Sequence, residues 1–228
     1  MTTTVKSAKS TKPAIRRTQE DRSAATRARL LEAAIDSLHT RGYAATTTMV
    51  VCEESGVSRG AMLHQFPSKV DLMLYVVKVV YEEDIALYQK ALGPLADARE
   101  RLLAFPKVAW EVLRRPAAVA ALEVLQGSRS DPELSARLKP LQKEIEQDSF
   151  RQAGAIIGAA NGRTSAAATR LFVWALRGLS VARVLTNEPA EIDESIELLR
   201  QMLTAALDAE VLQVPGETGR PKKKRSSR

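Results

Sequence analysis

The polar side chains whose types and spacing suggest chemistry lie between residues 46 and 69. Ser58 has a hydroxyl suited to cap the first backbone N–H groups of a helix that begins beside it. Gly56, just before, can adopt the positive φ of a tight turn without steric cost. Pro67 interrupts the helix after about two turns. So short a helix is not stable alone, and presenting its N-terminus to an anion such as a DNA phosphate would explain its presence.

Catalytic and metal chemistry have little support in the rest of the chain. One cysteine, Cys52, and two histidines, His39 and His64, exclude a disulfide framework within the chain and leave no set of ligands for zinc. No nucleophile, base and orienting group occur together, and no glycine-rich phosphate loop is present. We therefore expect a protein that is not an enzyme and that needs no cofactor or metal.

The positive charge of the chain is concentrated at its two ends. The formal net charge is +7, yet residues 1–17 and 216–228 each carry a net charge of about +5, which leaves residues 18–215 slightly acidic. A basic protein often binds nucleic acid. Here the net charge is only weak support for nucleic-acid binding, because it lies at the two ends. Support for that function must come from where individual residues are placed.

Apolar spacing throughout the chain predicts an all-α protein of about nine helices. No long run alternates with period two, and apolar residues recur on single helical faces. Pro106 is expected to kink or split the fifth helix. The predicted helices cover residues 23–40, 47–55, 58–65, 68–92, 97–114, 117–126, 131–160, 164–185 and from 189 to before 214.

The environment predicted for the chain is the cytoplasm. No apolar run approaches the ~18 residues that span a bilayer, and the basic N-terminus lacks the apolar segment of a secretory signal. We expect no membrane partner. Residues 1–20 and 214–228 are predicted to be a disordered basic arm and a disordered basic tail.

Residues 27–75 resemble the N-terminal domain of TetR-type transcriptional regulators. The stretches that carry the resemblance are RARLLEAAIDSLHTRGYAATT and ESGVSRGAMLHQFPSKVDL. The resemblance implies a helix-turn-helix DNA-binding domain over residues 21–70, joined by a long helix to a helical effector-binding and dimerisation domain over residues 71–213. Beyond residue 90 the likeness is one of architecture only.

The resemblance also implies a set of DNA contacts. It places six residues on the groove face of the recognition helix: Arg59, Gly60, Ala61, Leu63, His64 and Gln65. It places Thr46, Thr47 and Lys69 at phosphates and makes Met62 the core anchor. An arginine can bind a guanine edge through two hydrogen bonds. Because the family usually has tyrosine where this chain has Leu63, a phosphate-binding hydroxyl is missing there, and anchoring is expected from Thr47, His64 and Lys69.

Polar and amphipathic side chains among apolar neighbours suggest an effector pocket in the second domain. The candidates are Trp110, Glu123, Gln126, Trp174 and Arg177. Since a buried charge is costly without a partner, Arg177 is expected to pair with an acidic ligand or simply with Glu123. A purely structural role for each of these residues is the alternative.

Small residues on the predicted helix 164–185 suggest a subunit interface. Ala175, Gly178 and Ala182 form one stripe, along which helices can approach closely. Together with the last helix, the stripe predicts a four-helix homodimer interface; packing within one chain is the alternative. The function expected is a homodimeric repressor, released from a palindromic DNA operator by an unidentified small-molecule effector. The alternative is a helical ligand-binding scaffold with weak or no specific DNA binding.

Overall fold

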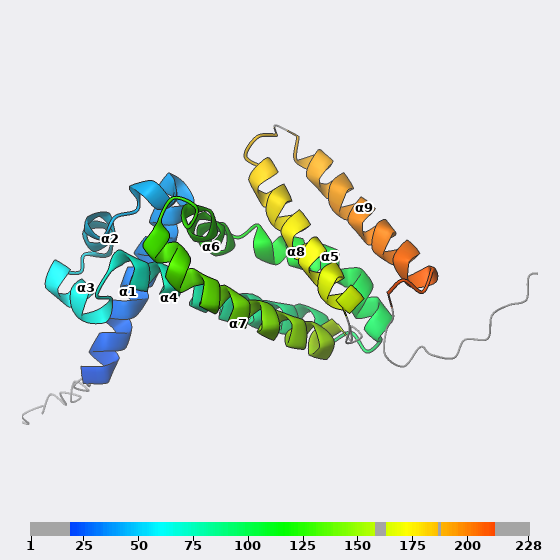
Figure 1. The fold of residues 1–228 in the computed structure, drawn as a ribbon, viewed down its shortest axis with the longest axis horizontal. Coiled ribbons are helices and arrows are strands. Elements are labelled where there is room, and N and C mark those ends of the chain that lie inside the picture. Colours follow the sequence, from blue (N-terminus) through cyan, green and yellow to red (C-terminus); the bar gives the residue numbers. More distant parts are fainter. Residues whose placement is uncertain (1–18, 158–162, 187, 213–228) are drawn as a thin grey trace, which may run out of the picture.

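The computed structural model describes residues 19–157, 163–186 and 188–212, which form nine α-helices and no strand. This confirms the predicted all-α fold. In Figure 1, α1–α3 gather at one end, α4 and α7 run side by side through the middle, and α8 and α9 lie at the other end. The helices are α1 (Gln19–Ala45), α2 (Thr48–Ser55), α3 (Arg59–Gln65), α4 (Lys69–Leu92), α5 (Ala98–Leu113), α6 (Pro116–Gly127), α7 (Pro132–Ile157), α8 (Arg163–Ala182) and α9 (Pro189–Asp208).

Capping groups fix the boundaries of the short helices, as their sequence predicts. The hydroxyls of Thr47, Ser58 and Ser68 each accept a hydrogen bond from a backbone N–H in the first turn of α2, α3 and α4. Gly56 ends α2 with a φ of 62°. Gly42 takes a φ of 76° near the end of α1, close to where the first helix was predicted to stop.

Two helices differ from their predicted course. α1 begins at Gln19, within the predicted disordered arm, and the remaining residues 1–18 of that arm lie outside the described part of the chain. α5 continues through Pro106, so the predicted split is wrong. Pro106 and apolar residues on both sides of it are buried, and this packing holds the two halves together although proline lacks the N–H of one helical hydrogen bond.

The largest apolar core does not stop at the end of the three-helix head. One cluster of buried side chains joins α1, α2 and α3 to the first half of α4, to α6 and to the start of α7. Leu30, Met62 and Val76 are fully buried within it. The second half of α4 packs in two smaller clusters with α5, α8 and α9. Thus α4 belongs to both the head and the body.

The predicted C-terminal tail and the end of the seventh predicted helix fall on residues 213–228 and 158–162, which lie outside the described residues. Among the described residues, no helix is long and apolar enough to cross a membrane.

Candidate nucleic-acid interface and body cavity

The outer face of α3 is open to solvent along its whole length. Arg59, Gly60, Ala61 and His64 are exposed, and 43% of Leu63 is exposed. Met62 is fully buried on the opposite face, as expected for the core anchor. Burial of Met62 fixes the rotation of this short helix, so that Gly60 and His64 lie on the side directly away from the core.

Arg59 stands at the first turn of α3 with its guanidinium uncommitted. It makes no hydrogen bond or ion pair with any other residue that the structure describes. A Cβ added at Gly60 would meet no atom within 4 Å. The backbone next to Arg59 can therefore come close to another surface, and the five donors of the guanidinium are available to it.

The two neighbouring threonines differ in what they can contact. Thr47 is exposed; its hydroxyl accepts from Val50 N at 3.2 Å, which leaves its own proton for an outside acceptor. Thr46 is fully buried, and its hydroxyl lies 2.8 Å from Gly42 O and 3.1 Å from Ser37 Oγ. The predicted phosphate contact of the Thr46 side chain is therefore wrong, because that buried hydroxyl is hydrogen-bonded within the head and cannot reach DNA.

Gln65 and Lys69 are polar residues already engaged within the protein. The Gln65 amide donates to Ser23 Oγ at 2.9 Å and accepts from Arg27 Nη2 at 3.1 Å, which ties the end of α3 to α1. Lys69 Nζ donates to Tyr43 O at 2.8 Å and lies 3.9 Å from the centre of the Tyr43 ring. Either side chain would have to exchange these contacts for new ones in order to meet DNA.

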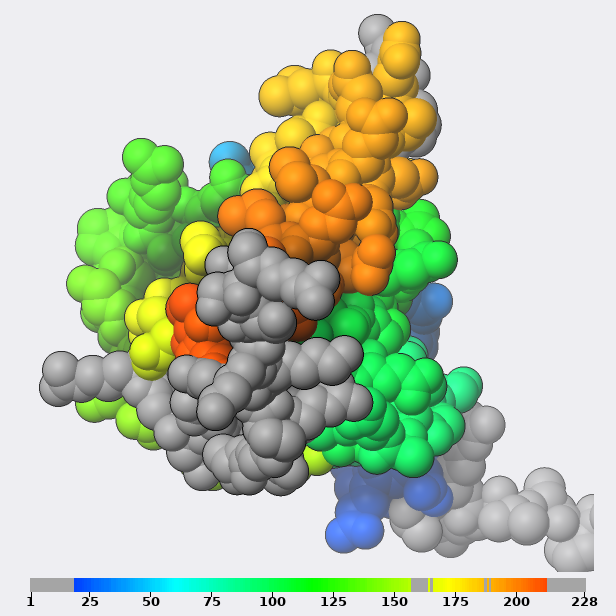
Figure 2. All heavy atoms as spheres, turned by 90° about the vertical axis from the view of Figure 1, so that its right-hand side faces the viewer, coloured from blue at the N-terminus to red at the C-terminus, as the bar shows by residue number. Residues whose placement is uncertain are grey.

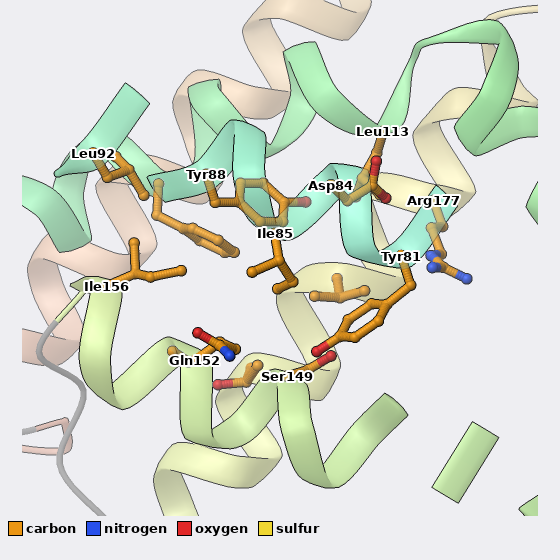
Figure 3. A pocket seen from close by; sticks show the side chains of 14 residues that line it. Tyr81, Asp84, Ile85, Tyr88, Leu92, Leu113, Ser149, Gln152, Ile156 and Arg177 are labelled. Atoms are coloured by element: carbon orange, nitrogen blue, oxygen red, sulfur yellow. The ribbon is translucent and has the colours of Figure 1, made fainter. Parts of the chain in front are cut away.

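A cavity lies in the body between α4, α5, α7 and α8, with a solvent-accessible volume of about 70 Å³. Figure 3 shows Asp84, Tyr81 and Arg177 toward one end, and Leu92 and Ile156 at the other. Ser149 and Gln152 line the wall that α7 contributes. A second cavity of about 100 Å³ between α7 and α8 shares Tyr81, Ser149, Thr169, Val173 and Arg177 with the first.

The polar end of this cavity is lined by Arg177 and by the buried carboxylate of Asp84, which Arg115 binds from outside the cavity lining. Asp84 is only 5% exposed and accepts a hydrogen bond from Arg115 Nη2 at 2.5 Å. Burial raises the pKa of Asp84 to about 6, although Arg115 and Arg177 oppose the rise. Burial also lowers the pKa of Arg177, against the attraction of Asp84 and Tyr88. Both shifts show that these charges are costly to bury.

Only part of the predicted effector set lines these cavities. Arg177 lines both, and Trp174 lines the second. Trp110 lines neither cavity and is 6% exposed within an apolar core cluster. Glu123 also lines neither; its Oε2 would lie 3.1 Å from a Cβ at Gly42, at the contact between α6 and α1. Gln126 is exposed on α6 and lines neither cavity.

Asp84 was not among the predicted site residues, although the sequence carries a signal for it. Asp84 lies four residues after the buried Val80 and four before Tyr88. Residues at that spacing share one helix face. A carboxylate on the apolar stripe of a long helix indicates a buried charge that needs a partner. The predicted alternative of an Arg177–Glu123 pair is wrong, because Arg177 faces Asp84 and Tyr88.

The last two helices leave large apolar side chains in solvent. On α8 and just beyond it, Leu171, Trp174, Val181 and Leu185 are 66, 46, 44 and 84% exposed. Leu198 and Met202 on α9 are each 56% exposed. The end of α8 and the start of α9 project from the body in two perpendicular views (Figures 1 and 2). Gly178 lies within the exposed stripe on α8, and a Cβ there would meet no atom within 4 Å.

In the ranges that the structure describes, no group of three or more His, Cys, Asp or Glu side chains is placed to hold a metal ion.

Known proteins similar to this chain are DNA-binding regulators. The family profile described as "Bacterial regulatory proteins, tetR family" matches residues 30–76, which run from α1 through α3 into α4. A solved putative transcriptional regulator from Saccharomonospora viridis, in complex with choline, has a similar fold. Its TM-score is 0.58 at 19% identity, with 83% of this chain and 99% of that one covered.

Similarity in sequence extends well beyond the head. An uncharacterised helix-turn-helix-type transcriptional regulator of Mycobacterium tuberculosis is 25% identical over 193 residues, which cover 84% of this chain and 99% of the relative. The regulator CymR of Pseudomonas putida is 29% identical over 135 residues, which cover 59% of this chain and 65% of CymR. With the matched profile and the exposed face of α3, these similarities identify the chain as a DNA-binding helix-turn-helix transcriptional regulator of the TetR family.

Proposed function

We propose that this protein is a homodimeric repressor that binds a near-palindromic operator and leaves it when a small molecule occupies the body cavity. It acts in the cytoplasm, where its DNA is. The observation that carries the DNA-binding part is the outer face of α3. Five of its seven residues are exposed, and Arg59 is uncommitted at the N-terminal end.

The contacts that we propose follow from exposure. Arg59 reads a base edge, Gly60 and Ala61 let the backbone approach the groove, and His64 and the Thr47 hydroxyl reach nearby phosphates. Leu63 offers only an apolar contact. Gln65 and Lys69 join after exchanging their contacts with Ser23 and Tyr43.

The exposed apolar stripes on α8 and α9 support a dimer. Large apolar patches on a soluble protein mark interaction surfaces, and a second copy of the same two helices would cover them by two-fold symmetry. Gly178 sits where the partner helix would come close. A dimer of this kind presents two copies of α3 to major grooves about 34 Å apart.

Release by an effector is supported by the position of the cavity. The cavity is lined by the second half of α4, whose first half packs in the core of the head. A molecule that shifts the second half of α4 would change the spacing of the two heads. A coupling of about 1–3 kcal/mol is typical of such linkage.

Selection from random duplexes tests the function. The full chain should enrich DNA with two inverted half-sites, and fluorescence anisotropy should show tighter binding to it than to a shuffled duplex of equal length. Arg59→Ala should lose about 1–3 kcal/mol of binding and relax selection at one base pair. Lys107→Ala removes a charge from an exposed position on α5 and should bind as the parent does.

The second candidate function is a helical ligand-binding scaffold without specific DNA binding. The exposed Leu63, where the family usually has tyrosine, favours it. Salt dependence separates the two candidates, since phosphate contacts make the binding constant fall steeply with salt while sequence preference persists. If no sequence is enriched and Arg59→Ala binds duplex as the parent does, the scaffold is the function.

A further inference from the structure

Arg177 carries a buried hydrogen-bond donor with no partner. Its Nη1 atom is out of contact with solvent and makes no hydrogen bond with any described residue. A buried donor left unsatisfied costs about 1–3 kcal/mol, and more on a charged group. Its Cζ lies 5.3 Å from the centre of the Trp174 ring. The guanidinium lies where the two body cavities meet, because Arg177 lines both of them.

The acidic groups near Arg177 are committed elsewhere. Asp84 binds Arg115 at 2.5 Å, and Asp148 accepts from the Tyr81 hydroxyl at 2.8 Å. Glu146, in the wall of the second cavity, pairs with Arg170 at 2.5 Å. Arg115 pairs with Asp84 and also lies 3.9 Å from Glu83. Among the described residues Arg177 therefore has no ion pair of its own, and a bound anion would give its buried Nη1 a partner.

The rest of the cavity is apolar and lies away from that charge. Ile85, Leu92, Phe105 and Ile156 line it, and Figure 3 places Leu92 and Ile156 at the end opposite Arg177. Ser149 and Gln152 supply neutral polar groups on one wall. A molecule with one charged end and a hydrocarbon body fits this arrangement, whereas an inorganic anion would leave the apolar end unfilled.

We propose that the cavity binds a small amphipathic carboxylate, whose oxygens accept hydrogen bonds from Arg177 and whose hydrocarbon part lies along Ile85, Leu92 and Ile156. This names the chemical class of the effector and rests on the proposed function only for the effect of binding on DNA. The neighbouring cavity meets the first at Arg177 and gives a longer molecule room to extend.

Isothermal titration of the full chain without DNA tests this assignment. The probes are butanoate, octanoate, benzoate and phenylacetate, each beside its neutral amide, together with octylammonium. At least one carboxylate should bind about tenfold or more tightly than its amide, which is the size of effect expected for a charge-assisted hydrogen bond. Octylammonium should bind more weakly than octanoate. The fluorescence of Trp174, which lies against Arg177, should change on binding.

Variants at Arg177 assign the preference to this side chain. Arg177→Gln should bind carboxylate and amide alike, while Arg177→Lys, which keeps the charge, should retain part of the preference. Arg114→Gln is the matched control, because Arg114 is exposed and pairs with Glu111. Circular dichroism establishes that each variant is folded; if Arg177→Gln does not fold, Arg177→Lys alone must weaken carboxylate binding without affecting the amide.

The assignment is overturned if no carboxylate binds, if amides bind equally well, if octylammonium binds more tightly, or if folded Arg177 variants keep the full preference. Operator binding is measured separately. A carboxylate that binds through Arg177 but leaves operator affinity unchanged supports the assignment and contradicts its role as the effector. Absence of sequence-specific DNA binding contradicts the proposed function without affecting the titration.

Discussion

The first three helices and the last two differ in how far their large apolar side chains are exposed to solvent. In α1–α3 most large apolar residues are directed into one core, with Met62 and Val51 fully buried; Met49 and Leu63 are the exposed exceptions. In α8 and α9 several of the largest apolar residues are more than half exposed, among them Leu171 and Met202. Most of the head is thus closed within one chain, whereas the C-terminal helices leave a continuous apolar surface that the proposed dimer would cover.

Two glycines show the same contrast at atomic scale. A Cβ at Gly127, where α6 ends beside the head, would lie 2.3 Å from Tyr43 Cγ, so only glycine fits there without a shift. A Cβ at Gly178 on α8 would meet nothing within 4 Å. Close approach within the chain explains the first glycine. No contact within the described chain requires the second, which in the proposed dimer would lie where a partner helix approaches.

The largest effect is expected from Gly178→Arg. The new side chain finds open space in the single chain but would block a helix of a second subunit. We expect a folded monomer by analytical ultracentrifugation. Operator affinity should fall about 10²–10⁴-fold, because the two heads no longer bind as one unit. Gln147→Arg adds the same charge at an exposed position of α7 and should remain dimeric. A dimeric Gly178→Arg would place the interface elsewhere.

In the head, Met62→Ala should lower the free energy of unfolding by about 2–5 kcal/mol, because it leaves a cavity in a closed core. Leu63→Ala, one residue along the same helix, should change it by no more than about 0.5 kcal/mol, since Leu63 is already 43% exposed on the surface. Chemical denaturation measures both. Equal losses would mean that α3 is rotated relative to the orientation described here.

The buried carboxylate in the body predicts a pH dependence of stability. The pKa of Asp84 is raised from 3.8 to about 6, with Arg115, Arg177, Glu83 and Tyr88 as the groups that act on it. Between these pH values the folded state keeps a proton that the unfolded chain has lost. The contribution of Asp84 to stability is therefore complete below pH 3.8 and falls as the pH rises through 6.

Comparison with Asp84→Asn isolates this contribution. The free energy of unfolding of the parent minus that of the variant should decrease by on the order of 2 kcal/mol between pH 4 and 7. Urea unfolding at several pH values measures it. A difference that is constant with pH, or that rises, would contradict a raised pKa.

Gly127→Ala tests the contact between head and body. The added methyl group must displace the Tyr43 ring, and overpacking of this kind costs about 1–3 kcal/mol. It also disturbs the hydrogen bond of 2.5 Å from the Tyr43 hydroxyl to Asp131 Oδ2. Gly60→Ala, at an open helical position on α3, should be neutral or stabilising. The midpoint temperature of thermal unfolding should therefore fall for Gly127→Ala and stay the same or rise for Gly60→Ala.

The smallest effect is expected from loss of one helix cap. Ser58→Ala removes the acceptor of Ala61 N and should cost about 1 kcal/mol of stability. Ser58→Gly should cost only a few tenths of a kcal/mol. Urea denaturation curves distinguish these values. If alanine and glycine behave alike, the hydroxyl does not cap α3.

The sequence alone was enough to predict features that depend on neighbours within about four residues. The turn at Gly56 and the cap at Ser58 appear where they were predicted, because a cap acts within its own first turn. The buried side of α3 was predicted as well, since helical spacing places Met62 opposite Gly60 and His64, which are exposed. These elements account for most of the head.

Tertiary structure decided which polar groups remain available. Thr46 and Thr47 are adjacent and chemically identical, yet only the packing of α1 shows that Thr46 is buried. Gln65 is tied to Ser23, 42 residues away, and Arg177 faces Asp84 from a different helix. Helical periodicity identifies the face on which a side chain lies but does not identify what covers that face. For this reason the sequence predicted which helix presents an exposed face, and only the packed structure located the cavity and the buried Arg177 Nη1 that has no hydrogen-bond partner among the described residues.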